Sequence, residues 1–243
     1  MTANPVSKLM LEIIYSDERL VAINKPHGLL VHKSFLAADA NEFAVQLLRD
    51  QIGRMVYPVH RLDRKTGGVL LFALDPEMNT LMQQHFADRK VEKTYLAIVR
   101  GHTPDNGVID YPLKREDGTM LESVTHFTTL ARAEIPIPSA RHPTSRYALV
   151  KLMPQSGRFH QLRRHMAHIF HPIIGDRPHG CNKQNKLWKV HFGMTNMLLH
   201  AWELRFEHPL SGNLIEIRAG LHGEFLRAKD MLFGDEAPIR CTS

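Results

Sequence analysis

One aspartate stands among basic residues in the segment His60-Arg61-Leu62-Asp63-Arg64-Lys65-Thr66-Gly67-Gly68. The neighbouring cations are expected to keep the Asp63 carboxylate ionised. An apolar run from Val69 to Leu74 follows and predicts a buried strand, and a loop that leads into a rigid strand is a common place for a catalytic group. The alternative interpretation is that Asp63 closes a turn while its basic neighbours are solvated.

A second basic segment begins at Ser156 and predicts a helix over residues 159–170. Its apolar positions, which fall on one face of such a helix, are Leu162, Met166, Ile169 and Phe170. An arginine one turn into this helix, Arg163, is placed to face a buried carboxylate. The alternative is an ordinary basic helix on the surface.

The start of this predicted helix has the features of an anion site. Ser156 and Gly157 are plausible capping residues, and the positive end of the helix dipole would lie beside Arg158 and His160. We therefore expect this end of the helix to bind an anionic group.

Three histidines recur at intervals of three residues, at positions 165, 168 and 171. His165 and His168 have the spacing of a zinc pair on a helix. No carboxylate or cysteine lies close to them in the sequence, and the His-x-x-Glu-His pattern is missing. We therefore predict no metal site.

Composition narrows the class of protein. The chain has 243 residues, of which 43% are hydrophobic, and Lys and Arg exceed Asp and Glu by 31 − 25 = 6. This modest basic excess is compatible with a polyanionic partner such as nucleic acid and equally with a merely basic enzyme. Two cysteines, Cys181 and Cys241, cannot supply a disulfide framework, and residues 1–10 show no secretory signal. We expect a cytoplasmic protein with no membrane-spanning segment.

Hydrophobic patterning predicts an α+β fold around a mixed, largely antiparallel sheet flanked by helices and loops. Strands are expected at 9–15, 20–24, 69–74, 94–99, 124–131, 147–153, 197–206 and 214–217, with the last two forming a hairpin. Helices are expected at 42–52, 76–86, 159–170 and 224–233. The segments 105–118 and 181–189 are predicted as loops. On the strand at 94–99, Tyr95, Ala97 and Val99 are expected to share one face.

Five motifs together resemble the pseudouridine synthases related to ribosomal large-subunit synthase A, the RluA family. They are, in chain order, Asn24-Lys25-Pro26-x-Gly28-x-x-Val31-His32, His60-Arg61-Leu62-Asp63-x-x-Thr66-x-Gly68, Glu92-Lys93-x-Tyr95-x-Ala97-x-Val99-x-Gly101, Gly157-Arg158-x-His160-Gln161-Leu162-Arg163-x-His165 with Pro172-Ile173-x-Gly175-Asp176, and Leu199-His200-Ala201-x-x-Leu204-x-Phe206-x-His208-Pro209. They span roughly residues 8–220. One departure is Gly67, where the family usually has serine.

This resemblance implies a pseudouridine synthase fold with a central catalytic cleft. It implies one catalytic domain over residues 1–243, with no N-terminal S4-like RNA-binding domain. Within the family the chain most resembles the type that acts on the uridine at position 65 of tRNA. A sister enzyme acting on ribosomal RNA would have the same catalytic residues, and a non-enzymatic RNA-binding protein would not need Asp63.

The implied reaction breaks the C1′–N1 bond of a uridine, turns the uracil over and joins C5 to C1′, without a cofactor. Asp63 either attacks C1′ or removes the 2′ proton. Arg163 would pair with Asp63, and Tyr95 would stack on the uracil and take part in removing the C5 proton. Arg61 would fill the space that the target base leaves. The partner is tRNA, with no obligate protein partner, and the expected RNA-binding residues are Arg61, Arg64, Lys65, Arg158, His160, Arg164, Lys183, Lys186 and Lys189.

Overall fold

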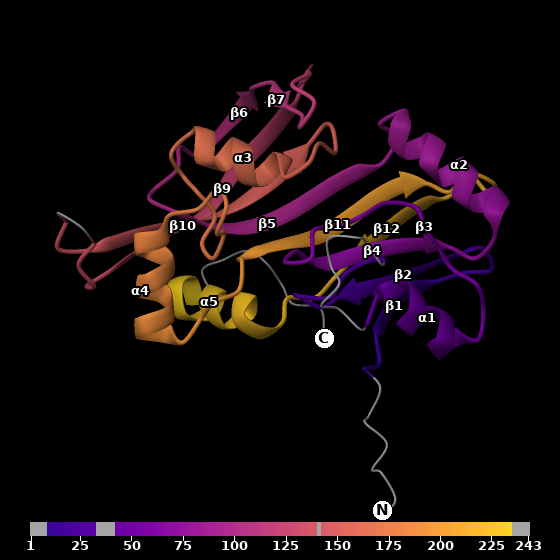
Figure 1. The fold of residues 1–243 in the computed structure, drawn as a ribbon, viewed down its shortest axis with the longest axis horizontal. Coiled ribbons are helices and arrows are strands. Elements are labelled where there is room, and N and C mark those ends of the chain that lie inside the picture. The colour runs from indigo at the N-terminus through magenta and orange to yellow at the C-terminus, as the bar shows by residue number, and fades with distance from the viewer. Residues whose placement is uncertain (1–8, 33–41, 140–141, 235–243) are drawn as a thin grey trace, which may run out of the picture.

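A ten-stranded sheet forms the frame of the computed structural model, which describes residues 9–32, 42–139 and 142–234 (Figure 1). The strands lie in the order β1-β2-β4-β11-β5-β10-β9-β6, with β3 beside β4 and β12 beside β11. Every pairing is antiparallel except that of β4 with β11. The predicted mixed, largely antiparallel α+β fold is thus confirmed.

The elements have the following bounds. The strands are β1 (Glu12–Ser16), β2 (Leu20–Lys25), β3 (Tyr57–Pro58), β4 (Gly67–Ala73), β5 (Glu92–Arg100), β6 (Asn106–Asp110), β7 (Leu113–Lys114), β8 (Met120–Leu121), β9 (Val124–Ile135), β10 (Ser145–Pro154), β11 (Leu199–Glu207) and β12 (Leu214–Arg218). The helices are α1 (Ala44–Ile52), α2 (Pro76–Ala87), α3 (Gln161–His168), α4 (Asn182–Phe192) and α5 (Gly223–Phe233). Strands β7 and β8 form a separate two-stranded sheet.

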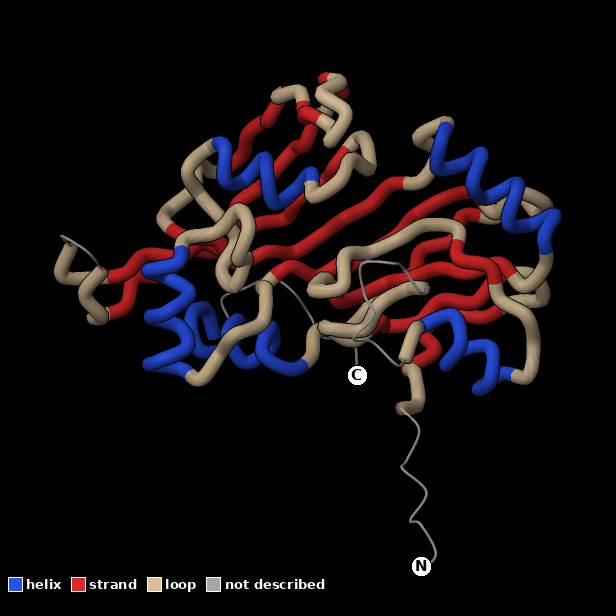
Figure 2. Tube along the Cα trace, in the orientation of Figure 1, coloured by secondary structure: helices blue, strands red, loops and turns tan. Residues whose placement is uncertain are grey.

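Helices cover both faces of each half of the sheet (Figure 2). In the half built on β2 and β4, Leu70 and Phe72 pack with α1, whereas Val69 and Leu71 pack with α2. In the half built on β5 and β10, one face packs on α3 and the other on α4 and α5. This two-sided cover explains why β4 is a continuous apolar run rather than an alternating one.

Local sequence signals place several elements. Helix α2 begins after Asp75, whose carboxylate accepts from the Met78 N–H, with Pro76 at its first position. On β5, Ala97 and Val99 pack with Tyr95 on the α3 side, as predicted.

The two halves meet where β4 runs parallel to β11, through the pairs His200–Gly67 and Ala201–Gly68. Gly68 has a φ of 107°, and a Cβ atom there would lie 2.1 Å from the Ala201 carbonyl oxygen. Only glycine fits this approach, because it tolerates positive φ and has no side chain. The segment that contains Asp63 enters β4 at this junction.

Some predictions were wrong. Residues 182–192 form α4 rather than a loop, and the segment 105–118 contains β6 and β7. Helix α3 begins at Gln161 and ends at His168, so Phe170 lies beyond it with a φ of 64° and is 78% exposed. Cys241 lies outside the described residues.

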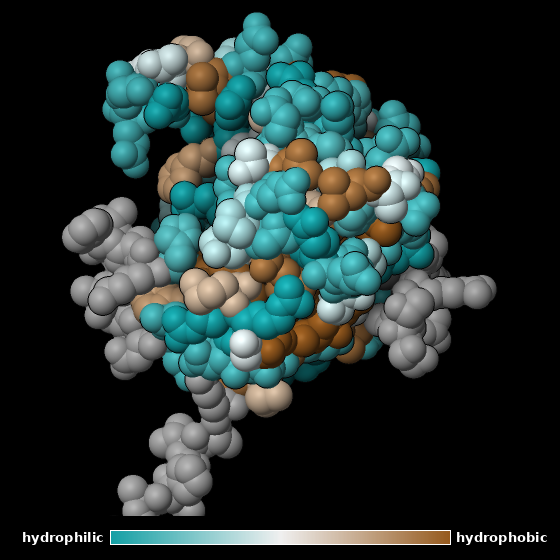
Figure 3. All heavy atoms as spheres, turned by 90° about the vertical axis from the view of Figure 1, so that its right-hand side faces the viewer, coloured by the Kyte–Doolittle hydropathy of each residue, from teal (hydrophilic) through white to brown (hydrophobic). Residues whose placement is uncertain are grey.

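The end of the molecule that carries α2 has a mostly hydrophilic surface with smaller apolar areas between the polar ones (Figure 3). In the described part of the chain, no helix is long and apolar enough to cross a membrane.

Candidate active site

The segment that carries Asp63 is held against β4 by its neighbours. The Nε2 atom of His60 accepts a hydrogen bond from the Leu71 N–H at 3.0 Å, and Leu62 is buried. Burial, together with the charge of Lys93, lowers the pKa of His60 to about 3, so this ring stays neutral and remains an acceptor. The turn itself is closed by the backbone, since the Thr66 N–H donates to the Asp63 carbonyl. The turn therefore does not need the Asp63 carboxylate as a cap.

The Asp63 carboxylate instead accepts from Arg163, with 2.9 Å between Nη1 and Oδ2. The same guanidinium forms two parallel hydrogen bonds with Asp176, from Nε to Oδ2 at 2.8 Å and from Nη2 to Oδ1 at 2.7 Å. Arg163 is 5% exposed and Asp176 is 1% exposed. Burial opposes the charge of Arg163, but the two carboxylates outweigh it and raise the pKa of the guanidinium. The expected pair is present, and a second carboxylate fixes its geometry.

The start of α3 is organised by Gln161 rather than by a capping serine. The Gln161 side chain accepts from the Ser156 hydroxyl and from the Arg158 N–H, and donates to the Val124 carbonyl and the Thr125 hydroxyl. The residue at the N-cap position is His160, which has a left-handed φ of 53° and no side-chain capping bond. The predicted caps at 156 and 157 were therefore wrong.

His160 faces the carboxylate but brings no charge to it at neutral pH. Its Nε2 atom lies 3.7 Å from Asp63 Oδ2, and its Nδ1 atom lies 3.0 Å from the Nε2 atom of His179. Burial lowers the pKa of His160 to about 4, against the effect of Asp63. At neutral pH the positive charge at the start of α3 therefore comes from Arg158 rather than from His160.

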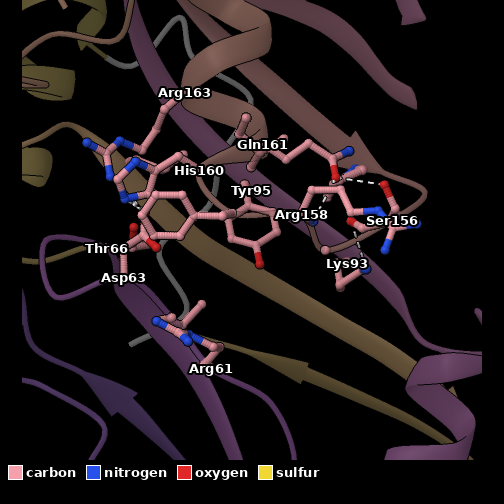
Figure 4. A pocket seen from close by; sticks show the side chains of 16 residues that line it. Arg61, Asp63, Thr66, Lys93, Tyr95, Ser156, Arg158, His160, Gln161 and Arg163 are labelled. Atoms are coloured by element: carbon pink, nitrogen blue, oxygen red, sulfur yellow. Dashed lines mark hydrogen bonds and ion pairs between the residues drawn. The ribbon is translucent and has the colours of Figure 1, made fainter. Parts of the chain in front are cut away.

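Tyr95 comes from β5 and lies close to Asp63 and His160 in the same cavity (Figure 4). Burial and the nearby Asp63 carboxylate both raise the pKa of its phenol, so the hydroxyl stays protonated. With Leu62 and Leu199 the ring forms an apolar wall of this catalytic cavity, whose volume is about 220 Å³. A planar, weakly polar group would fit against such a wall beside the carboxylate.

The structure brings together some of the predicted RNA-binding residues. Arg61 and Arg158 line the catalytic cavity, and Arg158 Nε approaches the Glu122 carbonyl at 3.5 Å. Arg64 and Lys65 line a neighbouring cavity of about 380 Å³. Arg164 lines neither of these cavities and donates to the Lys114 carbonyl.

The three predicted lysines of 181–189 lie on α4 and are exposed. Lys186 and Lys189 line a third cavity together with Arg177. Arg177 also lines the cavity next to the catalytic one. Basic side chains therefore continue from the Asp63 region to α4.

Sequence reasoning missed two buried groups. Asp176 is part of a quoted motif, but nothing in the sequence shows that its carboxylate reaches the guanidinium of Arg163. Lys25 is 0% exposed, and its Nζ donates to the carbonyls of Pro26, Leu29 and Arg64. It thereby ties the turn after β2 to the Asp63 segment, while burial lowers its pKa to about 7 against the effect of Asp63.

The zinc interpretation of the three histidines has no geometric support. The two ring nitrogens of His165 form hydrogen bonds with the Thr125 hydroxyl and the Tyr111 carbonyl. The His168 ring stacks on the Tyr111 ring. A ring nitrogen of His171 contacts the Arg100 carbonyl. Among the residues that the structure describes, no group of three or more histidine, cysteine or acidic side chains is arranged to hold a metal ion.

Comparison with known proteins identifies the family of the chain. The model of the RNA pseudouridylate synthase family matches residues 19–168, and the chain belongs to that family of isomerases. It is 49% identical over 223 residues to tRNA pseudouridine synthase C of Vibrio cholerae, covering 87% of this chain and 91% of that protein. It is 47% identical to the protein of the same name from Pasteurella multocida, covering 90% and 94%.

A solved structure has the same fold. Human RNA pseudouridylate synthase domain containing 4 superposes with a TM-score of 0.69 at 27% sequence identity, covering 90% of this chain and 91% of that chain. The predicted pseudouridine synthase fold and the RluA-family resemblance are both confirmed.

Proposed function

We propose that this protein converts one uridine of tRNA, the one at position 65, into pseudouridine. The observation that carries the proposal is the Asp63 carboxylate, held by Arg163 beside Tyr95 in a small, half-apolar cavity. The names of the bacterial relatives support tRNA as the substrate. The whole chain acts as one catalytic domain, and a tRNA substrate makes the cytoplasm its place of action.

Asp63 supplies the reactive carboxylate. In the isomerisation the C1′–N1 bond breaks and a C1′–C5 bond forms, while C5 loses a proton and N1 gains one. Asp63 either adds its electron pair to C1′ as the uracil leaves with the N1 pair, or removes the 2′ proton to give a glycal. Both routes need an ionised carboxylate aimed at the ribose, and no step needs a metal ion.

Arg163 and Asp176 act as positioning residues. The fork to Asp176 fixes the guanidinium, so Arg163 presents its Nη1 to Asp63 in a single geometry. If Asp63 becomes esterified, it loses its charge, but Arg163 remains paired with Asp176. The buried cation is therefore never left without a carboxylate, which would otherwise cost several kcal/mol.

Tyr95 and Arg61 handle the base. The neutral phenol ring of Tyr95 stacks on the uracil, and its raised pKa keeps its hydroxyl protonated. Arg61 is exposed beside the same cavity and fills the place that the flipped base leaves in the RNA.

The test is to incubate the purified protein with unmodified tRNA and unmodified ribosomal RNA, with and without a metal chelator. Pseudouridine is then mapped by a chemical adduct that stops reverse transcription. We expect one stop in tRNA, at position 65, in both conditions. A stop in ribosomal RNA alone contradicts the substrate, and loss of the stop in chelator that zinc restores contradicts the metal-free mechanism.

A further inference from the structure

Phe159 is an exposed aromatic residue at the point where two cavities meet. It is 59% exposed, and it lines both the catalytic cavity and the neighbouring cavity of about 380 Å³. The two cavities also share Arg61 and Asp63. A group bound in the second cavity would therefore be the immediate neighbour of a group bound at Asp63.

The Phe159 ring has a rigid support. It stacks on the His160 ring with 3.7 Å between centroids and 21° between planes. His160 is in turn held by its contact of 3.0 Å with His179. Because the pKa of His160 is lowered to about 4, this is a stack of neutral rings at pH 7. An aromatic ring that is supported in this way and still exposed provides a surface on which another flat ring can stack.

The second cavity combines this ring with positive charge. Leu30 and Pro178 add apolar surface, and Lys65 and Arg177 add cations. Asp63 is the one acidic residue among its described lining residues, and it is paired with Arg163. An apolar surface next to cations fits a nucleotide, whose base is flat and whose phosphate is anionic.

We propose that Phe159 is the stacking platform for a second base, that of a nucleotide adjacent to the target uridine, with its phosphate near Lys65 and Arg177. This inference rests on the proposed function, because it assumes an RNA whose uridine reaches Asp63. When the target uridine leaves its stack, the adjacent base stacks on Phe159, and this new contact offsets part of the stacking energy that is lost on flipping. It also makes the identity of the neighbouring nucleotide a determinant of specificity.

The opposing interpretation is that Phe159 only packs against His160 and keeps that ring near Asp63. The two interpretations differ in whether the effect of Phe159 depends on a base in the RNA. A double-mutant cycle between the protein and the RNA measures this dependence directly.

The experiment uses the full-length protein and tRNA transcripts in which the nucleotide on the 5′ or the 3′ side of the target is intact or abasic. Dissociation constants are measured for the parent, Phe159→Ala, Phe159→Leu, Phe159→Trp and the control Phe170→Ala. Phe170 is also an exposed phenylalanine, but it follows the far end of α3 and lines neither cavity. Melting temperatures establish that each variant is folded.

We expect Phe159→Ala and Phe159→Leu to weaken binding of intact tRNA by about 5- to 150-fold, the range for stacking of one base. Phe159→Trp should bind like the parent, and Phe170→Ala should have no effect. On one of the two abasic RNAs, parent and Phe159→Ala should bind equally. If Phe159→Ala weakens binding equally on intact RNA and on both abasic RNAs, or does not weaken binding at all, the proposal that Phe159 stacks on a second base is refuted. Pseudouridine formation by the parent on intact tRNA is read separately, so failure of the proposed function is distinguished from failure of this inference.

Discussion

The two walls around Asp63 differ in how their polar groups are satisfied. One, the bonded wall, consists of Gln161, Arg163 and Asp176, which are buried and hydrogen-bonded to defined partners. The other, the open wall, consists of Arg61, Phe159 and Arg177 and continues through Arg177 to Lys186 and Lys189 of α4, and all five are exposed. The charged side chains of the open wall make no hydrogen bond or ion pair with another residue in the described part of the chain.

This difference matches two physical requirements. A carboxylate that acts on a ribose must be held in one geometry before the substrate arrives, because reorganisation during the reaction raises the barrier. Phosphate contacts need only exposed cations with freedom to adapt, and their strength comes from the release of counterions. The comparison predicts that changes in the bonded wall alter chemistry and stability, whereas changes in the open wall alter RNA affinity.

The largest effect is expected for Asp63→Asn. Asparagine is nearly isosteric and the turn is closed by the backbone bond from Thr66, so the protein should fold. The amide cannot attack C1′ or take the 2′ proton, so pseudouridine formation should fall below detection. Binding of tRNA should stay the same or tighten, because one negative charge leaves a basic cleft. Melting, binding and product are measured on one preparation, and turnover by the well-folded variant would contradict the catalytic role.

The second largest effect is expected for Arg163→Ala, and the adjacent Arg164→Ala is its comparison. Arg163→Ala leaves the carboxylate of Asp176 buried without its partner, which costs about 3 to 5 kcal/mol of stability. It should also slow the single-turnover reaction at saturating protein by more than a hundredfold, an order-of-magnitude expectation for a lost positioning contact. Arg164→Ala removes only a contact with the Lys114 carbonyl and should change the rate little.

Arg163→Lys is a second variant for this comparison, in case Arg163→Ala fails to fold. Arg163→Lys keeps the positive charge but cannot form both arms of the fork, so it should be more stable than Arg163→Ala and still slow. Equal rate defects at positions 163 and 164 would show that the bonded wall does not position Asp63.

A smaller effect is expected on the open wall, at α4. Lys186→Gln with Lys189→Gln removes two cations, and each lost phosphate contact should reduce the slope of log K against log salt by about 0.7 to 0.9. The rate at saturating protein should be unchanged. Lys90→Gln is the control, because Lys90 lines none of the three cavities and pairs with Asp88. An unchanged slope in the double variant would remove α4 from the RNA-binding surface.

The smallest effect concerns pH and the buried support of Asp63. Folding lowers the pKa of His60 from 6.5 to about 3. Between these two pH values the imidazole is protonated in the unfolded state but not in the folded state. The free energy of unfolding therefore falls as the pH falls through this range. At pH 5 the loss relative to pH 7 is about 2 kcal/mol, or about 4 to 8 °C in melting temperature for a chain of this size.

Glutamine at position 60 can still accept from the Leu71 N–H but does not titrate. His60→Gln should therefore show a smaller drop in melting temperature between pH 7 and pH 5 than the parent. Other buried histidines, such as His200, whose pKa burial lowers to about 4, remain in both proteins and set the residual drop. Identical drops in the two proteins would mean that His60 is not held neutral by the fold.

Elements with a strong local signal were predicted well. Strand β4 is a buried apolar run bounded by glycines and Asp75-Pro76, and α2 begins at the proline as expected. Helix α4 was missed because its burial depends on few residues, chiefly Gln184 and Trp188. The Tyr147 hydroxyl on β10 donates to the Gln184 side chain, and the sequence contains no sign of that contact. Strand β6 was missed because it is an edge strand in which Ile109 alone is buried.

The sequence alone specified the candidate site residues of this protein and the order of its motifs. Charge and periodicity left the interpretations of Asp63 and of the basic helix open, because they act over a few residues. The resemblance of five motifs to a known family pointed to Asp63, Tyr95 and Arg163. The sequence did not specify which carboxylates share the guanidinium of Arg163, that His160 is neutral, or that Phe159 is exposed between two cavities. Those properties depend on burial and on contacts between residues up to 100 positions apart in the chain, such as Asp63 and Arg163. They arise only when β4 and β11 join the two halves of the sheet.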